Sequence, residues 1–267
     1  MVDQPKRTLS PRIVWITGAS SGMGYEMALA FARHGDHVAV SARRLDRLDT
    51  LVGAAKGLPG RVKAFGGDVI SESDMQRVAA GIEAEWGRLD VLIANAGLGQ
   101  RGSIVDSQWD DLEAVLRTNV EGVLHSVRAA VPLMRKVDSG HIITVSSVTA
   151  IAVPPYATVY GASKAALNAI ARGLRLELAP DHIWVTNVIV GQTATEFAEK
   201  RRGQSGRVAE QVPTMSAAFA AARIVRQADR RRRTVVLRPL DRLIVFAGMF
   251  LPGLMDRVLA GIYKPKA

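Results

Sequence analysis

The sequence predicts an α/β fold, a single domain built on a doubly wound, seven-stranded parallel sheet with helices on both faces. Short apolar runs typical of buried strands recur along the chain, and helical patterns separate most of them. The chain has 267 residues, of which 48% are hydrophobic, and no linker divides it. This length and composition suffice for one large hydrophobic core, so we expect one domain over residues 11–267.

The expected strands are seven apolar runs: residues 12–17, 37–42, 62–66, 91–94, 141–146, 184–190 and 234–237. Because the intervening segments are mostly helical in pattern, we expect parallel pairing through right-handed crossovers. Residues 1–10 contain Pro5 and several charges and are expected to be a flexible tail. They lack the apolar core of a signal peptide, and the chain has no cysteine, which together favour a cytoplasmic protein.

The first strand leads directly into a glycine-rich turn at residues 18–24, and an apolar helix follows over about 25–33. In this context glycines let the backbone approach a pyrophosphate, which N–H groups at the helix start can bind. A turn without a ligand is the alternative. The pattern favours a Rossmann-like nucleotide site formed by Gly18, Ser20, Ser21, Gly22, Met23 and Gly24.

The second strand is followed by Arg43 and Arg44, where a protein that binds NAD would carry a carboxylate for the adenosine ribose. No acid is present at this point of the sequence, and the two arginines offer cations for the 2′-phosphate of NADP. The sequence therefore favours NADP(H) over NAD(H). The alternative is that one arginine opens the next helix and pairs with Asp46 or Asp49.

Three polar residues near the fifth strand suggest a proton-transfer site. Tyr160 and Lys164 lie one helical turn apart, and Ser147 follows the run 141–146. An ammonium one turn from a phenol favours the phenolate, so this pair is suited to exchange a proton with an alcohol or carbonyl. Ser147 could donate a hydrogen bond to the same substrate oxygen. The alternative is a solvated tyrosine and lysine on an amphipathic helix, with a serine that merely ends a strand.

The spacing Thr17-Gly18-x-x-x-Gly22-x-Gly24, together with Tyr160-x-x-x-Lys164, resembles the short-chain dehydrogenase/reductase family over nearly the whole chain. The resemblance implies a catalytic set, which is Asn119, Ser147, Tyr160 and Lys164. It also implies further cofactor contacts, from Asp68, Val69, Asn95, Ala96, Gly97, Tyr160, Lys164, Thr193 and Thr195. Taken singly, Asp68 could cap a helix, Asn95 could end a turn, and Asn119 could bond back within its helix.

The implied reaction is direct hydride transfer between a nicotinamide and a carbonyl or alcohol carbon, with Tyr160 exchanging the proton of the oxygen. Lys164 would also hold the nicotinamide ribose. Asn119 would interrupt the regular bonding of its helix and hold a water that links Lys164 to solvent. Two positions depart from the family's pattern: Val190-Gly191 replaces the usual Pro-Gly pair, and Ser21 stands where some NADP-using relatives carry a basic residue.

Two segments near the expected substrate site lie outside the family's motifs. Residues 196–212 are polar and basic, and they are expected to form a mobile lid over the substrate or else a solvated connection. Residues 239–267 form an apolar C-terminal extension. Its apolar stretch, 243–255, is too short to span a bilayer and is interrupted by Pro252 and Gly253.

Three uses remain open for this extension. It packs against the core or a second subunit, which we favour because long exposed apolar patches are uncommon. Otherwise it walls an apolar substrate pocket, or it rests on a membrane, where the arginines at 230–233 could bind anionic lipid. Peripheral membrane contact is therefore open but not favoured.

The net charge of +10 does not by itself indicate nucleic-acid binding, because the basic segments lack interleaved aromatic residues and no nucleic-acid module is recognisable. The five histidines are scattered, and we expect no metal site.

The sequence thus predicts an NADP(H)-dependent oxidoreductase acting on a moderately large, apolar carbonyl or alcohol. The family suggests a homodimer or homotetramer packed through the helices that carry Asn119 and Tyr160. A 3-oxoacyl thioester reductase and a non-catalytic NADP-binding sensor or scaffold are the alternatives.

Overall fold

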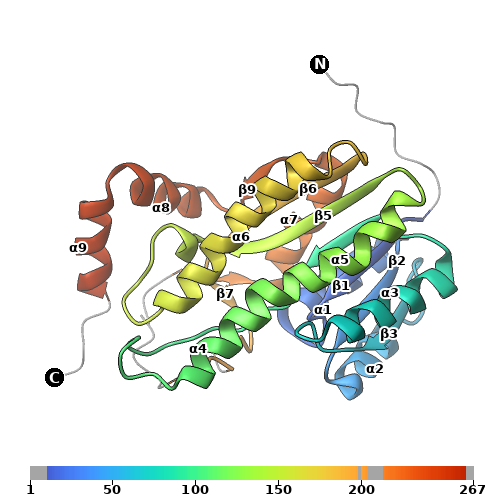
Figure 1. The fold of residues 1–267 in the computed structure, drawn as a ribbon, viewed down its shortest axis with the longest axis horizontal. Helices are drawn as coiled ribbons and strands as arrows, with labels where there is room; N and C mark the ends of the chain where they lie inside the picture. Colours follow the sequence, from blue (N-terminus) through green and yellow to red (C-terminus); the bar gives the residue numbers. More distant parts are fainter. Residues whose placement is uncertain (1–10, 198–199, 204–212, 263–267) are drawn as a thin grey trace.

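A computed structural model describes residues 11–197, 200–203 and 213–262 of the chain (Figure 1). Its centre is a seven-stranded parallel sheet in the order β3-β2-β1-β4-β5-β6-β9. The order reverses between β1 and β4, which makes the sheet doubly wound. The predicted fold is therefore confirmed. The expected tail, residues 1–10, lies outside the described residues.

The strands of the main sheet are β1 (Ile13–Thr17), β2 (His37–Ala42), β3 (Val62–Gly66), β4 (Val91–Ala94), β5 (Gly140–Ser147), β6 (Ile183–Val190) and β9 (Thr234–Val236). Each differs from its predicted run by no more than one residue at either end. A separate two-stranded sheet pairs β7 (Thr193–Ala194) with β8 (Met215–Ser216). These short strands were not predicted, because two-residue runs carry no hydrophobic periodicity.

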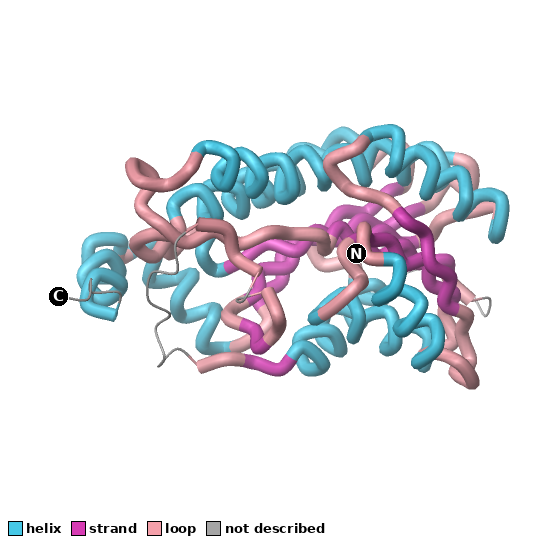
Figure 2. The backbone as a smooth tube through the Cα atoms, turned by 90° about the horizontal axis from the view of Figure 1, so that it is seen from below, coloured by secondary structure: helices cyan, strands magenta, loops and turns pink. Residues whose placement is uncertain are grey.

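The helices are α1 (Gly22–Arg33), α2 (Leu45–Ala54), α3 (Glu72–Trp86), α4 (Trp109–Leu116), α5 (Gly122–Arg135), α6 (Thr158–Glu177), α7 (Ala217–Arg230), α8 (Pro239–Phe250) and α9 (Pro252–Ile262). A π-helix, Arg117–Glu121, joins α4 to α5, and a 3₁₀ turn, Val148–Ala150, follows β5. Figure 2 shows helices on both sides of the strands. One core lies beneath α1, α2 and α7, and the other beneath α3, α5 and α6.

The side chains of β1 pack alternately into the two cores. Val14 and Ile16 belong to the core beneath α1, whereas Ile13 and Trp15 belong to the core beneath α3. Successive side chains of a strand point to opposite faces, so an unbroken apolar run is what a sheet covered on both faces requires.

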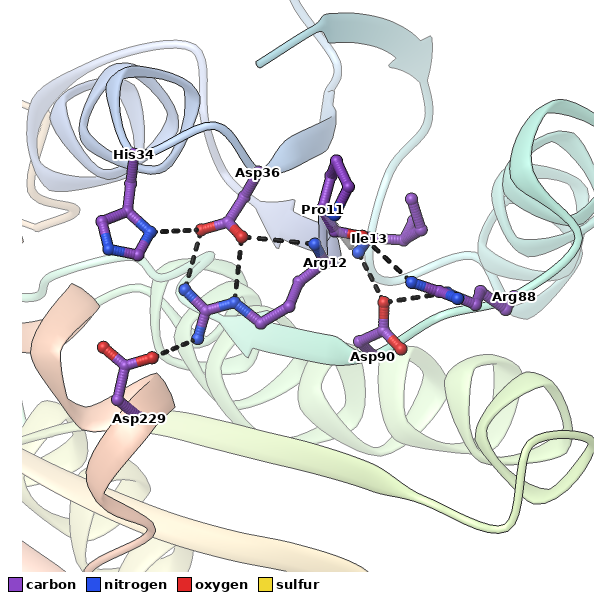
Figure 3. Close-up of polar contacts among 8 residues, drawn as sticks. All are labelled: Pro11, Arg12, Ile13, His34, Asp36, Arg88, Asp90 and Asp229. Atoms are coloured by element: carbon purple, nitrogen blue, oxygen red, sulfur yellow. Dashed lines mark hydrogen bonds and ion pairs between the residues drawn. The ribbon is translucent and has the colours of Figure 1, made fainter. Parts of the chain in front are cut away.

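An ionic cluster anchors β1 at its amino end (Figure 3). The buried carboxylate of Asp36 accepts hydrogen bonds from Arg12 Nε at 3.0 Å and Nη2 at 2.7 Å, and Arg12 Nη1 donates to Asp229 at 2.7 Å. Beside this cluster, the main-chain N–H of Ile13 donates to Asp90 at 2.7 Å. These contacts hold the amino-terminal end of β1 in place, on the side of the sheet opposite the carboxyl ends of the strands.

The C-terminal extension forms two helices that project from the body of the domain (Figure 1). The expected break at Pro252 is confirmed, because α8 ends at Phe250 and α9 starts at Pro252. No helix in the described ranges is long and apolar enough to cross a membrane. The arginines at 230–233 precede β9, whereas α8 follows it, so the basic run and the apolar helices lie at opposite ends of that strand.

Burial of this extension against the chain's own core, one of the uses that the sequence favoured, is not what the structure shows. Large apolar side chains of both helices are more than 40% exposed, and they include Leu243, Phe246, Met249, Phe250 and Leu254. Only one side of α8 contacts the domain: a Cβ built on Gly248 would lie 3.0 Å from Ile151 Cγ2. Contact with a second subunit stays a prediction.

Candidate active site

The glycine turn after β1 requires glycine at positions 18 and 24. Gly18 has a φ of +67°, and a Cβ there would lie 2.7 Å from Ala96 Cα. A Cβ on Gly24 would lie 2.5 Å from the carbonyl oxygen of Gly18. Helix α1 begins at Gly22, and the side chain of its N-cap residue, Ser21, makes no capping bond. The first N–H groups of α1 are therefore available to an anion.

Asn95 shapes this turn from the end of β4. Its Nδ2 donates to the carbonyl oxygens of Thr17 at 2.9 Å and Gly18 at 3.2 Å, while its own N–H donates to Thr17 Oγ1 at 3.1 Å. Thr17 Oγ1 also accepts from the N–H of Ala96 at 3.1 Å. The side chain predicted to contact a cofactor thus holds the loop that would receive it, beside Ala96 and Gly97.

The arginines after β2 face different partners. Arg44 Nη2 donates to Ser20 Oγ at 2.9 Å and Ser21 Oγ at 3.2 Å, so its guanidinium lies against the glycine turn. Arg44 is also the N-cap residue of α2, as the alternative expected, but the acid with which it forms an ion pair is Glu196 at 3.9 Å and not Asp46 or Asp49. Arg43 is 72% exposed and lies 3.6 Å from the carboxylate of Asp68. Two cations therefore border the nucleotide end of the site.

Asp68 follows β3 and helps to shape the neighbouring turn. Its Oδ1 accepts from the N–H of Ile70 at 3.3 Å, and its own N–H donates to Asp74 at 2.9 Å. The alternative that Asp68 caps α3 is wrong, because Ser71 is the capping residue and accepts from Asp74 N–H at 3.2 Å. Val69 is buried beside it.

The three predicted proton-transfer residues come together at the carboxyl end of β5. Ser147 is its last residue, and Tyr160 and Lys164 lie on α6. Ser146 ties the two elements together, because its Oγ donates to the carbonyl oxygen of Lys164 at 3.1 Å. Lys164 Nζ donates to the carbonyl oxygen of Val145 at 2.9 Å and lies 5.9 Å from the centroid of the Tyr160 ring.

Burial decides the protonation of both groups on α6. It lowers the pKa of Lys164 to about 8 and raises the pKa of the Tyr160 phenol. The Ser147 hydroxyl and the charges of Arg201 and Arg101 oppose the rise in the phenol's pKa without reversing it. Desolvation thus outweighs these opposing influences, and the expectation that Lys164 favours the phenolate stays a prediction.

Asn119 lies within the π-helix, so the expected interruption of regular helical bonding is present. Its fully buried amide clamps the loop after β4: Oδ1 accepts from Leu98 N–H at 2.7 Å, and Nδ2 donates to Leu98 O and to Ser163 Oγ, each at 2.9 Å. These bonds contradict the alternative of back-bonding within the helix. A Cβ on Gly97 would lie 3.4 Å from Asn119 Oδ1 and 3.5 Å from Lys164 Nζ. Gly97 therefore lies between the buried amide of Asn119 and the ammonium of Lys164.

A single cavity of about 1090 Å³ unites these elements at the carboxyl ends of the strands. Every predicted site residue except Asn119 lines it: Gly18, Ser20, Ser21, Gly22, Met23, Gly24, Arg43, Arg44, Asp68, Val69, Asn95, Ala96, Gly97, Ser147, Tyr160, Lys164, Thr193 and Thr195. The volume exceeds what drug-sized ligands ordinarily occupy, so a dinucleotide and a substrate fit together. Within the described residues, no cluster of acidic or histidine side chains could hold a metal ion.

The loop after β6 closes the cavity near the glycine turn. A Cβ on Gly22 would lie 3.2 Å from Thr195 Cβ, and Thr193 Oγ1 donates to Gly191 O at 3.1 Å. Gly191, in the unusual Val-Gly pair, is required by its neighbours, since a Cβ there would lie 2.2 Å from Asp241 Oδ1. Asp241 is buried and pairs with Arg238 at 2.7 Å within the first turn of α8, and Arg238 Nη1 donates to the carbonyl oxygen of Pro213 at 2.9 Å.

Some lining residues were not named as site residues from the sequence, although Phe197 and Arg201 lie within the expected lid, 196–212. Phe197 stacks obliquely on Tyr160 with ring centroids 5.8 Å apart. Arg101 and Arg201 lie on the same side of the cavity as the phenol, whose pKa they influence. Helices α8 and α9 contribute apolar side chains to the lining of the cavity, among them Ile244, Met255 and Leu259, while their use as a substrate wall stays a prediction. Most of the expected lid, 204–212 and 198–199, lies outside the described residues.

Comparison with known proteins gives a consistent relationship. Residues 12–206 match the short chain dehydrogenase family. The chain is similar to the 3-oxoacyl-[acyl-carrier-protein] reductase FabG of Thermotoga maritima, with 35% identity over 192 residues that cover 72% of this chain and 78% of FabG. It is 36% identical over 193 residues, 72% of the chain, to glycine betaine reductase ATRR of Emericella nidulans, a longer protein of which the chain spans 15%.

A solved structure shows the same arrangement. A short-chain dehydrogenase from Sphingobium yanoikuyae in complex with NADPH superimposes with a TM-score of 0.77 and 29% sequence identity. The superposition covers 91% of this chain and 94% of that one.

Proposed function

The chain belongs to the short-chain dehydrogenase/reductase family of oxidoreductases, and from this premise we propose that it interconverts a ketone or aldehyde and an alcohol by hydride transfer, using NADP(H) in preference to NAD(H). One observation carries the proposal: the Tyr160 phenol and the Lys164 ammonium line the same cavity as the open start of α1. A phosphate-binding turn and a proton donor in one cavity are what such a reaction requires.

The bound cofactor would supply or accept the hydride at its nicotinamide. The chain's own residues handle the oxygen of the substrate. Tyr160, which is protonated at neutral pH as an ordinary phenol is, donates a proton to the carbonyl oxygen during reduction. The Ser147 hydroxyl donates a hydrogen bond to that oxygen as negative charge develops there. Lys164, with a pKa of about 8, supplies positive charge near the phenol and holds the ribose.

Preference for NADP rests on the end of β2. Arg44 is held at the glycine turn by Ser20 and Ser21, and Arg43 lies beside it, mostly exposed. A 2′-phosphate placed at the adenosine ribose would meet two guanidinium groups there. Asp68 lies 3.6 Å from Arg43 and Glu196 lies 3.9 Å from Arg44, and neither acid belongs to the segment directly after β2. A basic pair without a ribose-binding acid after β2 supports NADP over NAD.

The apolar wall formed by α8 and α9 supports a moderately large, apolar substrate. A second candidate is reduction of a 3-oxoacyl thioester, which the similarity to FabG favours. A third, from a different class, is a sensor or scaffold that binds NADP without turnover. The complete set of Asn119, Ser147, Tyr160 and Lys164 argues against it, since binding alone does not require a proton donor.

Cofactor oxidation by the purified protein tests the proposal. NADPH and NADH are each offered with aldehydes, aryl ketones, long-chain ketones and 3-oxoacyl thioesters. Tyr160→Phe should retain NADPH binding and lose at least about 10²-fold in kcat, the lower end of what a positioned acid contributes. Tyr25→Phe removes a phenolic hydroxyl from α1 outside the cavity and should change kcat little. Near-normal turnover by Tyr160→Phe would contradict the assignment.

We further propose a homodimer or homotetramer packed through the helices beside Asn119 and Tyr160. Trp109, at the start of α4, is 68% exposed, and Leu176, near the end of α6, is 78% exposed. Large apolar side chains at these levels suit contact with another subunit. Light scattering after size exclusion should report a multiple of the 28.7 kDa chain, and particles of that mass alone would contradict the proposal.

A further inference from the structure

Three consecutive residues after β6 each contact a different part of the site. Thr195 packs on the glycine turn, since a Cβ on Gly22 would lie 3.2 Å from Thr195 Cβ. The ring of Phe197 lies against that of Tyr160, with centroids 5.8 Å apart, and its N–H donates to Thr195 Oγ1 at 3.3 Å. The backbone of Glu196 is therefore held between two packed neighbours.

The carboxylate of Glu196 lies among the cations at the nucleotide end of the site. Its Oε2 is 3.9 Å from Arg44 Nη1 and also pairs with Lys200. The hydrogen bond and charge of Lys200, together with the charges of Arg47 and Arg44, hold the pKa of the Glu196 carboxyl below its usual value of 4.5. Glu196 therefore carries a full negative charge at neutral pH.

Arg44 makes its two sets of contacts with different nitrogens of one guanidinium. Nη2 donates to Ser20 Oγ at 2.9 Å and to Ser21 Oγ at 3.2 Å, whereas Nη1 lies beside the Glu196 carboxylate. A phosphate monoester carries about 1.5 to 2 negative charges at neutral pH. Because like charges repel, a 2′-phosphate at Arg44 and the carboxylate of Glu196 would each weaken the contact of the other with the guanidinium.

Lys200 limits the cost of this competition. It pairs with the same oxygen of Glu196, so the carboxylate keeps a cation when a phosphate takes its place at Arg44. The side chains of Arg44 and Glu196 are 37% and 39% exposed, and ion pairs at such positions change an equilibrium constant by up to about fivefold. The carboxylate should therefore weaken the binding of a 2′-phosphate by a few fold without preventing it.

We propose that Glu196 is a determinant of cofactor choice: its carboxylate competes with the 2′-phosphate of NADP(H) for Arg44 and thereby reduces the preference that Arg43 and Arg44 would otherwise give. The inference rests on the proposed function, because it requires the 2′-phosphate to meet Arg44. NAD(H) has an uncharged hydroxyl in place of this phosphate, so its affinity should depend little on the charge of Glu196.

Cofactor binding tests the competition without requiring turnover. NADPH and NADH, which differ only in the 2′-phosphate, are titrated into the full chain and into Glu196→Gln, and binding is followed by nicotinamide fluorescence. In the variant NADPH should bind about three- to fivefold more tightly at low ionic strength, while the Kd for NADH stays within about 1.5-fold. The gain should shrink as salt is added, because it arises between partly exposed charges.

Two further variants locate the effect. In an Arg44→Gln background, Glu196→Gln should no longer favour NADPH, because the competition needs the guanidinium. Glu72→Gln is the charge-matched control: it removes a 46% exposed carboxylate that pairs with Arg128 at 3.2 Å and does not line the cofactor cavity. A gain for NADPH that persists without Arg44 would show that Glu196 acts through Lys200. That result, or the same gain in Glu72→Gln, would overturn the inference.

Failure of the inference and failure of the proposed cofactor preference give different results. If the wild type prefers NADPH and Arg44→Gln abolishes the preference, but Glu196→Gln leaves both affinities unchanged, the preference stands and the inference is wrong. If the wild type binds both cofactors alike and Glu196→Gln confers a preference for NADPH that needs Arg44, the inference stands and the proposed preference falls. An equal gain for NADPH and NADH would also overturn the inference, because Glu196 would then act on the part that the two cofactors share.

Discussion

Neutralising the buried carboxylate of Asp36 should cost more stability than neutralising an exposed acid of the same ionic cluster. Its side chain is 6% exposed, and its oxygens accept from the main-chain N–H, Nε and Nη2 of Arg12 (Figure 3). These bonds hold the pKa of the Asp36 carboxyl below its usual value of 3.8 and raise that of the Arg12 guanidinium. Asp36→Asn keeps the shape but removes the charge opposite a guanidinium that is itself only 19% exposed.

The expected loss in the free energy of unfolding depends on the contacts that Arg12 keeps in Asp36→Asn. Removing one partner of a buried ion pair costs about 3–5 kcal/mol when the other charge is left without compensation. Arg12 still has Asp229 at 2.7 Å, and an asparagine oxygen can still accept one of its bonds. We therefore expect a loss of about 2–3 kcal/mol in the free energy of unfolding, measured by urea denaturation at pH 7. Asp229→Asn, at a 48% exposed partner, should cost about 0–1 kcal/mol.

The dependence on pH separates this ion pair from simple packing. A carboxyl with a lowered pKa in the folded state stabilises above its unfolded pKa and loses that contribution as pH falls through the folded value. The difference between wild type and Asp36→Asn should therefore be constant from pH 7 to about pH 5 and shrink below about pH 4. If Asp36→Asn costs no more than Asp229→Asn, or if the difference persists unchanged at pH 3, the reasoning is wrong.

Three further changes have defined outcomes. Burial lowers the pKa of His141 to about 3, so wild type should lose about 1.4 kcal/mol per pH unit below its unfolded pKa of 6.5, a slope that His141→Gln should lack in denaturation curves from pH 6 to 4. Arg43→Ala combined with Arg44→Ala should lower the ratio of kcat/KM for NADPH to that for NADH by at least about tenfold, and an unchanged ratio would exclude these arginines from cofactor choice. In Gly18→Ala a residue with a side chain would have to adopt a φ of +67°, with its Cβ 2.7 Å from Ala96 Cα. The variant should lose the fluorescence enhancement of bound NADPH and about 1–3 kcal/mol of stability. Normal NADPH binding would contradict the role of the glycine turn in binding the cofactor.

Much of the fold could be predicted because its signals are local. A strand buried on both faces is an unbroken apolar run, so β2, β3 and β4 start and end where the sequence indicates. The glycine turn was equally clear, since Gly18, Gly22 and Gly24 follow the first strand at a characteristic spacing, although the contacts that require Gly18 and Gly22 come from the distant residues Ala96 and Thr195. By contrast, the start of α8 lies against Gly191 in the loop after β6 and bonds through Arg238 to Pro213, and no periodicity encodes these contacts.

The substrate side of the site could not be predicted for the same reason. The catalytic residues were found because family spacing marks them, but Arg101 and Arg201 carry no motif. Each is one arginine among many in a polar stretch. Their positions near Tyr160 result from main-chain bonds between residues about one hundred positions apart, 99–101 and 202. Only the folded chain shows that two segments, each unremarkable in the sequence, approach one phenol.

The protonation of Tyr160 shows how these parts depend on one another. The sequence pairs the phenol with Lys164, yet in the structure the lysine is itself desolvated, and its pKa falls to about 8 while that of the phenol rises. A phenol is protonated at neutral pH at its ordinary pKa of about 10, and burial of Tyr160 raises that pKa further. The charges of Arg101 and Arg201 oppose this rise without reversing it, so the proposed reduction starts from a protonated phenol.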